Sequence, residues 1–284
     1  MFKKYLIIAS KQDPAGVNIV NQLKQFRPNP VLSGISKDKP SFDFYLVEGD
    51  VLHEENLDLE RIDKYDFVIF ASKHSTVSGS KEKTLSIHSP GNWREARGGG
   101  KSGKVCPASS LFNKTIFENL NQEAENAKLT GDSENQRTYN VTLECTHHGP
   151  LMDKPCLFIE IGSTEREWKD KRAGFVLAKT IKKTIDEFKE NPYREVGIGL
   201  GGPHYCPNFN KIQRESNVAI SHIIPGYMIP ITKEMVDEAW VKTLEEVDFV
   251  VLDWKGLGKS TQRQELIDIL ENNHVQWKKT KDIK

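Results

Sequence analysis

Short apolar runs alternate with segments of helical periodicity along almost the whole chain, and this alternation limits the possible folds more than any other feature. The runs at 5–10, 42–47 and 65–71 predict strands, and Asp13-Pro14 between the first two begins a helix. The second half repeats the pattern, with strands expected at 141–145, 156–161, 195–200, 218–222 and 248–252. Strands that alternate with helices predict a three-layer α/β fold, in which a mixed sheet carries helices on both faces.

The segments between these strands complete the expected architecture. Helices are expected at 109–129, 165–189, 232–247 and 258–272. Polar residues interrupt the apolar spacing of the first of these helices, which predicts a surface position. Residues 72–107 are polar and rich in Gly, and so long a stretch indicates a functional or mobile loop. We expect 1–284 to form one compact unit, with a division into 1–80 and 81–284 as the alternative.

Charge and cysteine usage narrow the class of protein. Forty Lys and Arg balance forty Asp and Glu, so no global field attracts nucleic acid or membrane, and any polyanion must meet a local patch. No run approaches the roughly 20 apolar residues that span a bilayer, and the apolar start is too short for a signal peptide. The four cysteines have no CxxC spacing or disulfide framework. These features predict a cytoplasmic protein that contacts no membrane.

Histidines gather at turns that contain Gly or Pro. Five of the eight histidines lie at such turns: His88, His147, His148, His204 and His222. His147 and His148 are adjacent, so both imidazoles can serve one site only if the strand ends and the backbone turns, as Gly149-Pro150 indicates. They could be metal ligands, a general base with its partner, or structural histidines. The remaining three, His53, His74 and His274, have no supporting context.

Other residues extend this candidate site. Zinc catalysis usually needs three protein ligands, and His204 could supply a third imidazole, with Glu160 or Glu144 as a carboxylate. His88 could be a base or a ligand. The residues expected to complete a substrate pocket are Asn92, Trp93, Gly201, Gly202, His222 and Lys255. The two glycines would let the backbone approach a ligand closely, and Trp93 would offer a face for stacking. His222 and Lys255 could also be ordinary residues after strands.

Two Gly-Lys-Ser stretches suggest nucleotide binding but fail the spacing test. A P-loop needs a Gly five residues before its Gly-Lys pair, and Glu95 and Asp253 occupy those positions. The first stretch has another use, because Arg94, Arg97 and Lys101 lie among its glycines. Cations beside Trp93 suit a phosphodiester backbone and an unstacked base, and the alternative is a solvated loop.

Taken together, the motifs resemble one family. They lie at 86–92, 146–150, 160–164, 201–205 and 221–225. In order and combination they resemble the archaeal and plant type of D-aminoacyl-tRNA deacylase, from the first strand to 255–257. The resemblance implies hydrolysis of the ester between a D-amino acid and the terminal ribose of tRNA. It also implies a zinc cofactor and a fold similar to phosphorylases and peptidyl-tRNA hydrolases.

The resemblance suggests roles for the candidate residues, and we expect a monomer that binds the acceptor end of tRNA. The catalytic candidates are His147, His148, Glu160 and His88. The metal ligands expected are His147, His148, His204 and Glu160. The residues expected to bind substrate or tRNA are Asn92, Trp93, Arg94, Arg97, Lys101, Gly201, Gly202, His222 and Lys255. Cys145 is a soft ligand that would change the site if it bound metal.

Two other functions remain open at this point. Clusters of His and Glu also serve metal-dependent amidohydrolases and aminopeptidases that act on small substrates. A tRNA-binding module without turnover is the alternative from another class. The balanced charge argues against the module, because such proteins usually carry a basic excess.

Overall fold

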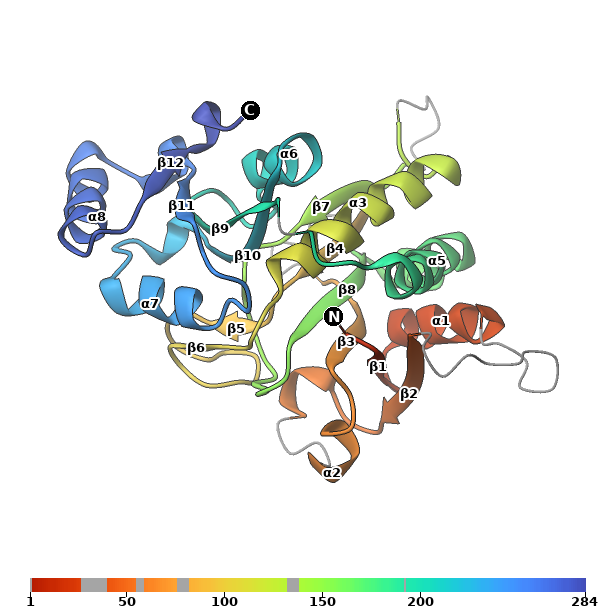
Figure 1. Cartoon of the computed structure of the whole chain (residues 1–284). Coiled ribbons are helices and arrows are strands. Elements are labelled where there is room, and N and C mark those ends of the chain that lie inside the picture. The colour runs from red at the N-terminus through yellow and green to blue at the C-terminus, as the bar shows by residue number, and fades with distance from the viewer. Residues whose placement is uncertain (1, 27–39, 55–58, 76–81, 132–137, 192) are drawn as a thin grey trace.

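The computed structural model describes residues 2–26, 40–54, 59–75, 82–131, 138–191 and 193–284, and it confirms the α/β class (Figure 1). A six-stranded sheet has the order β2-β1-β3-β8-β4-β7. Its strands are β1 (Lys4–Ser10), β2 (Ser41–Val47), β3 (Phe67–Lys73), β4 (Thr84–His88), β7 (Asn140–Leu143) and β8 (Cys156–Gly162). Neighbouring strands are parallel except β4 and β8, which are antiparallel. Because β8 lies between β3 and β4, this sheet joins the first 80 residues to later ones.

A second sheet is parallel throughout and has the order β10-β9-β11-β12. Its strands are β9 (Glu195–Leu200), β10 (Val218–Ile224), β11 (Phe249–Leu252) and β12 (Trp277–Lys279). A short antiparallel pair, β5 (Gly91–Asn92) and β6 (Lys104–Val105), lies outside both sheets. The strands are thus divided between two principal sheets.

Helices cover both sheets. The helices are α1 (Pro14–Leu23), α2 (Leu59–Ile62), α3 (Ser110–Asn126), α4 (Glu165–Trp168), α5 (Lys171–Glu187), α6 (Pro207–Glu215), α7 (Lys233–Val241) and α8 (Ser260–Asn272). Helices α1, α3 and α5 pack on one face of the first sheet, while α7 and α8 pack on the outer face of the second. Helix α3 contacts α5, β4 and β10, so one apolar core runs from the first sheet to the second. Among the described helices, none is long and apolar enough to cross a membrane.

Apolar and polar residues alternate along β4 and β8, and this gives the middle of the first sheet a polar face. Leu85 and Ile87 of β4 and Ile159 of β8 belong to the apolar core beneath α1, α3 and α5. Successive side chains of a strand point to opposite faces, so His88 and Glu160 point away from that core. The strand pairing, which places Ser86 opposite Glu160, keeps these two side chains close.

Three of the expectations for helices and loops were wrong. The expected loop at 72–107 contains β4, a buried central strand, although 76–81 lie outside the described residues. The helix at 109–129 is buried, because its polar side chains find partners inside: Asn113 donates to Ser89 Oγ, and Asn119 donates to Thr184 Oγ1. The helix at 165–189 is two helices, since the first ends at Trp168 and Asp170 caps the start of α5 by accepting from Arg172 N.

Candidate active site

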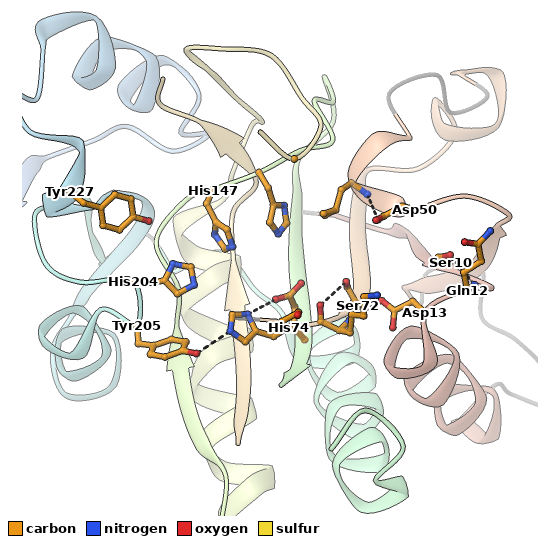
Figure 2. A pocket seen from close by; sticks show the side chains of 16 residues that line it. Ser10, Gln12, Asp13, Asp50, Ser72, His74, His147, His204, Tyr205 and Tyr227 are labelled. Carbon is orange, nitrogen blue, oxygen red and sulfur yellow. Dashed lines mark hydrogen bonds and ion pairs between the residues drawn. The ribbon is translucent and has the colours of Figure 1, made fainter. Parts of the chain in front are cut away.

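The main pocket of the described residues lies where the polar face of the first sheet meets the turns of the second (Figure 2). Its volume is about 680 Å³. Tyr205 and Tyr227 bound it on one side and Ser10 and Asp50 on the other, with His147 between them. The pocket is therefore assembled from segments far apart in the sequence.

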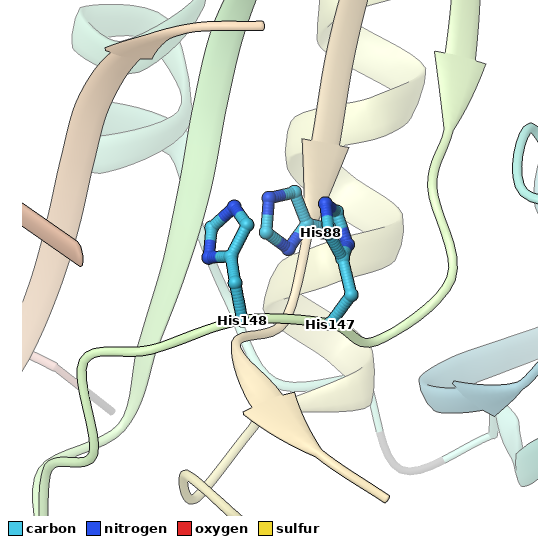
Figure 3. Close-up of side chains that lie close together, drawn as sticks. All are labelled: His88, His147 and His148. Carbon is cyan, nitrogen blue, oxygen red and sulfur yellow. The ribbon is translucent and has the colours of Figure 1, made fainter. Parts of the chain in front are cut away.

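Three imidazoles, which we call the histidine cluster, meet at the centre: His88, His147 and His148 (Figure 3). His88 ends β4, and the other two lie in the turn after β7. His148 has a φ of +42°, so the backbone turns there and both adjacent imidazoles reach one site. One nitrogen from each of the three rings lies within 4.8 Å of the others.

Main-chain carbonyls orient these rings. The Nδ1 atoms of His147 and His148 donate to the carbonyls of Cys145 and Gly149, both at 2.8 Å, and His88 Nδ1 donates to Ser89 O at 3.3 Å. In a neutral imidazole whose Nδ1 is a donor, Nε2 carries a free lone pair. Burial lowers the pKa of His147, with a further contribution from His88 and His148, and burial with His88 lowers the pKa of His148 to about 4. These two histidines are therefore neutral at physiological pH.

A second group, which we call the Glu144 array, consists of His74, Glu144 and His204. The pKa values of its two histidines are raised rather than lowered. His74 Nδ1 lies 3.1 Å from Glu144 Oε1, and His204 Nε2 lies 3.1 Å from Glu144 Oε2. Burial alone would lower the pKa of His74, but Glu144 and Glu160 raise it to about 10. Burial also opposes the charge of His204, yet Cys145 and Glu144 raise its pKa to about 10. Although burial would raise the pKa of Glu144, His204 and His74 hold it well below its usual range.

Glu160 lies between the two groups. Its Oε2 atom is 3.5 Å from His74 Nδ1 and 3.9 Å from His88 Nε2. Burial would raise its pKa, but the interactions with His74 and His88 lower it. Glu160 is only 2% exposed, so the site contains an ionised carboxylate that is largely shielded from solvent.

Two tyrosines and a cysteine extend the Glu144 array towards the rim of the pocket. His74 Nε2 is 3.0 Å from Tyr205 Oη. On the other side, Cys145 Sγ lies 3.5 Å from His204 Nδ1 and 3.0 Å from Tyr227 Oη. Polar contacts thus run from Tyr227 through the buried array to Tyr205.

Comparison with known proteins gives a consistent result. Residues 62–278 match the model of a family described as D-aminoacyl-tRNA deacylase. The D-aminoacyl-tRNA deacylase of Methanocaldococcus jannaschii is 31% identical, over 97% of this chain and 99% of its own length. That of Thermococcus onnurineus is 34% identical, over 91% of this chain and 93% of its own.

The chain belongs to the D-aminoacyl-tRNA deacylase family. A crystal structure of a conserved protein of unknown function has the same fold, with a TM-score of 0.81 and 26% identity. The similarity covers 99% of this chain and 96% of that one. The fold described above is therefore shared over the whole length of both chains.

The resemblance to this family implies zinc, and the side chains of this member fit such an ion. His88 Nε2 is buried and has no hydrogen-bond partner among the described residues, which is costly for a polar atom unless a ligand binds it. Metal-binding imidazoles usually donate their other nitrogen to a carbonyl or carboxylate, as all three members of the histidine cluster do. Three further groups with close donor atoms involve Glu144, Glu160, His204 or Cys145.

The structure brings together most of the residues predicted for catalysis. His88, His147, His148 and Glu160 meet as expected. His204 lies beside His147, with ring centroids 4.7 Å apart, but it pairs with Glu144. These placements are geometric, and the catalytic roles of the residues stay predictions.

Several of the predicted binding residues instead support the architecture. Trp93 is 3% exposed, so its ring is not available as a stacking face. His222 is fully buried, is bonded to Thr146 Oγ1 and does not line the pocket. Gly201 and Gly202 have φ values of +96° and +82° and lie outside the pocket lining, where they shape the exit of β9. Lys255 is exposed on a 3-10 turn that also lies outside the lining.

The loop at 93–104, which carries the cations predicted to bind tRNA, is bonded to other parts of the protein. Asn92 Nδ2 donates to Gly99 O at 2.9 Å, and Arg94 donates to the carbonyls of Met228 and Pro230. Arg97 donates twice to Glu95. Lys101 is exposed. Of the cations predicted to bind tRNA, Arg94 is thus already used to anchor the loop.

Sequence reasoning missed His74 and the two tyrosines. His74 was set aside because no Gly or Pro stands beside it. The feature that could have indicated a site residue is the position of His74 directly after β3, the most apolar strand of the first half of the chain. Polar residues at the carboxyl ends of buried parallel strands often face a ligand crevice, and this rule would have selected it.

Proposed function

We propose that this chain hydrolyses the ester that joins a D-amino acid to the terminal ribose of tRNA. Membership of the D-aminoacyl-tRNA deacylase family supports the substrate class. The observation that carries the chemistry is the histidine cluster beside the ionised Glu160 in a pocket of about 680 Å³. Because every residue of this site comes from one chain, the proposal assigns the activity to the monomer. A tRNA substrate also places it in the cytoplasm.

We assign zinc to the histidine cluster, through the Nε2 atoms of His88, His147 and His148. A zinc ion there would polarise the ester carbonyl and lower the pKa of a bound water. His88 replaces His204 in the ligand set expected from the sequence, because Glu144 already engages His204 Nε2. A protonated imidazole cannot serve as a metal ligand.

The remaining groups supply proton transfer and charge stabilisation. Glu160 accepts a proton from the attacking water, since it is ionised and borders the cluster, and returns it to the ribose oxygen as the ester C–O bond breaks. His74, which is buried, and His204, which is partly buried, are cationic, so they stabilise the negative charge that develops on the ester oxygens. Tyr205, bonded to His74 at the rim, orients that imidazole towards the leaving ribose.

The decisive experiment measures release of D-tyrosine and L-tyrosine from matched charged tRNAs, with chelation and zinc restoration. We expect release of the D form alone, lost on chelation and regained with zinc. D-specific release that survives chelation would support the activity and reject zinc. Hydrolysis of a small D-amino-acid amide, without release from charged tRNA, would replace the proposal with an amidohydrolase. Salt-sensitive tRNA binding without any turnover would replace it with a binding module.

Replacing His147 or His148 by Ala tests the zinc assignment directly. Loss of one of three imidazoles should lower bound zinc and reduce turnover by roughly 100-fold or more, since ligand loss weakens both binding and orientation. Metal content per chain and kcat are the measurements. His53→Ala, at an exposed histidine outside the pocket, is the control and should change neither. Unchanged zinc and turnover in both variants of the cluster would refute the assignment.

A further inference from the structure

We propose that the 3′-terminal strand of tRNA leaves the pocket over Tyr205 and follows helix α6 towards the basic C-terminal segment. We call this surface the α6 track and define it by Tyr205, Lys211, Arg214, Lys281 and Lys284. The inference rests on the proposed function for the identity of the strand. It names a surface that sequence reasoning did not select, in place of the loop at 93–104.

Adjoining hollows define the α6 track. His204 and Tyr205 line the main pocket and also a second hollow of about 560 Å³, which extends to Lys211 and Arg214. A third hollow of about 430 Å³ shares Lys211 with the second and extends to Lys281 and Lys284. Figure 1 shows α6 beside the C-terminal end, and α6 contacts the last 3-10 turn. The three hollows therefore follow one another from the histidines to the end of the chain.

The charge of the α6 track suits a phosphodiester backbone. Lys211 and Arg214 are exposed, and their partners are surface carboxylates at 3.9 Å and 3.4 Å. Exposed pairs of this kind contribute little and exchange readily for other anions. Lys281 and Lys284 are exposed and have no hydrogen bond or ion pair within the described part of the chain. Phosphates bound by these cations would release counterions, which makes binding sensitive to salt.

Tyr205 supplies the other element of a single-strand site. Its ring is half-buried and stands between the main pocket and the second hollow. Proteins that bind single strands commonly stack bases on such rings while cations follow the backbone. A terminal ribose placed at the histidines would leave the next base near Tyr205 and the following phosphates near Lys211 and Arg214.

The loop at 93–104 is less suited to this role. Arg94 is bonded to two carbonyls, Arg97 to Glu95, and Lys104 to Glu238 at 2.8 Å. Within the described residues, Lys101 is the one cation of this loop without such a contact. A strand crossing this loop would have to displace Arg94 from the two main-chain carbonyls that anchor the loop, whereas along the α6 track it would exchange only exposed ion pairs.

The test compares a triple variant, Lys211→Glu/Arg214→Glu/Lys281→Glu, with the wild-type chain. Fluorescence anisotropy with uncharged, labelled tRNA should show binding weakened at least about tenfold. The slope of log K against log salt should fall by roughly two, because each lost phosphate contact lowers it by somewhat less than one. The value of kcat/KM on the D-tyrosyl ester of adenosine, which cannot reach α6, should stay within about twofold of wild type.

Three comparisons make the result decisive. Lys24→Glu, in the 3-10 turn directly after α1, reverses one exposed charge and should weaken tRNA binding less than Lys211→Glu does. Lys211→Gln/Arg214→Gln removes charge without adding repulsion and should still weaken binding. Arg97→Glu/Lys101→Glu tests the rival route, and a larger loss there than on α6 would overturn the inference.

Failure of the inference can be told from failure of the proposed function. Unchanged tRNA binding in the triple variant, or an equal loss on the adenosine ester, would reject the α6 track. The binding assay needs no turnover. A wild-type chain that binds tRNA through α6 but releases no D-tyrosine would therefore support the track while rejecting the deacylase.

Discussion

His74 and His204 both pair with Glu144, while His147 and His148 in the same pocket donate to main-chain carbonyls. A buried carboxylate favours the imidazolium form, whereas burial beside other imidazoles favours the neutral form. One residue type therefore takes two protonation states within one pocket. The neutral rings suit metal binding, and the cationic ones suit the stabilisation of an oxyanion.

Replacing Glu144 by Gln should flatten the dependence of stability on pH in metal-free protein. The pKa values of His74 and His204 are raised to about 10, so their stabilisation is complete below the unfolded value of about 6.5 and is lost as pH rises through 10. The lowered pKa of Glu144 gives stabilisation above the unfolded value of about 4.3, which is lost as pH falls through the folded value. The array contributes most between about pH 4.5 and 6.5.

Thermal denaturation of metal-free protein at acid, mildly acid and alkaline pH measures this effect. The wild-type Tm should fall on both sides of the window, and the Tm of Glu144→Gln should change less. Glu165→Gln is the control, because Glu165 is exposed and its ion-pair partner within the described part of the chain is Lys169. A Glu144→Gln profile that runs parallel to wild type would show that the array does not govern this dependence.

At the level of residues, prediction from sequence succeeded where neighbouring Gly and Pro residues indicate a turn. His147 and His148 stand before Gly149-Pro150, and the backbone turns there as expected. His74 carries no such signal, because its partners Glu144 and Tyr205 are 70 and 131 residues away. Its role depends on which strands are neighbours, and that information is not local.

Among the elements, the histidine turn and the loop at 93–104 pack backbone against backbone. Gly149 N donates to Gly98 O at 2.7 Å. A Cβ on Gly149 would lie 2.3 Å from Gly100 N and 2.4 Å from the carbonyl carbon of Gly99. Because main-chain atoms cannot yield as a flexible side chain can, the contact fixes where His148 lies relative to the loop.

Gly149→Ala should therefore displace the loop from the histidine turn. We expect a loss of about 1–3 kcal/mol in the free energy of unfolding, as for other overpacked sites, together with weaker zinc binding. Urea denaturation and a zinc competition assay measure the two effects. Gly98→Ala is the matched control, since its Cβ would meet His148 Cβ at an ordinary 3.4 Å. Equal losses in both variants would contradict the explanation.

Element prediction failed where polar residues occupy buried positions. In β4, the polar residues Thr84, Ser86 and His88 alternate with the apolar Leu85 and Ile87. Because polar residues make up half of this short strand, its sequence resembles that of the loop around it. In α3, the buried Asn113 and Asn119 donate hydrogen bonds to hydroxyls of other elements. Strands whose two faces are both apolar, such as β3, were predicted correctly.

On the scale of the whole molecule, one core joins the two sheets, and Phe112 of α3 lies within it. Its ring centroid is 4.2 Å from that of Phe67 and 5.1 Å from that of Phe188. The same core includes Val218 and Val251 of the second sheet. This continuity predicts that both sheets unfold together.

Phe112→Ala should lower the free energy of unfolding by about 3–5 kcal/mol and keep a single transition. Urea denaturation followed by far-UV circular dichroism and by tryptophan fluorescence, which includes Trp254 and Trp277 near the second sheet, measures this. Phe175→Ala is the control at a residue that is 40% exposed, and it should cost much less. Two separate transitions would contradict the prediction and favour a division of the chain.

The partition of strands between two sheets could not be read from the sequence. Apolar runs identify strands, but they do not show that β8 inserts between β3 and β4 or that β12 adds to the second sheet. Pairing depends on long-range contacts, which have no local signature. The gathering of histidines was predictable because the motifs lie at strand ends, whereas the link from His204 to Glu144 was not.

The bond between His204 and Glu144 crosses from the second sheet to the first and has a consequence for synthesis on the ribosome. Chains grow from the amino terminus, so His74, His88, Glu144 and Glu160 are made before His204. Until residue 204 emerges, Glu144 has only one of its two cationic partners. The nascent chain would hold most of the pocket without its final charges, and the finished site would arise only when the second sheet closes against the first.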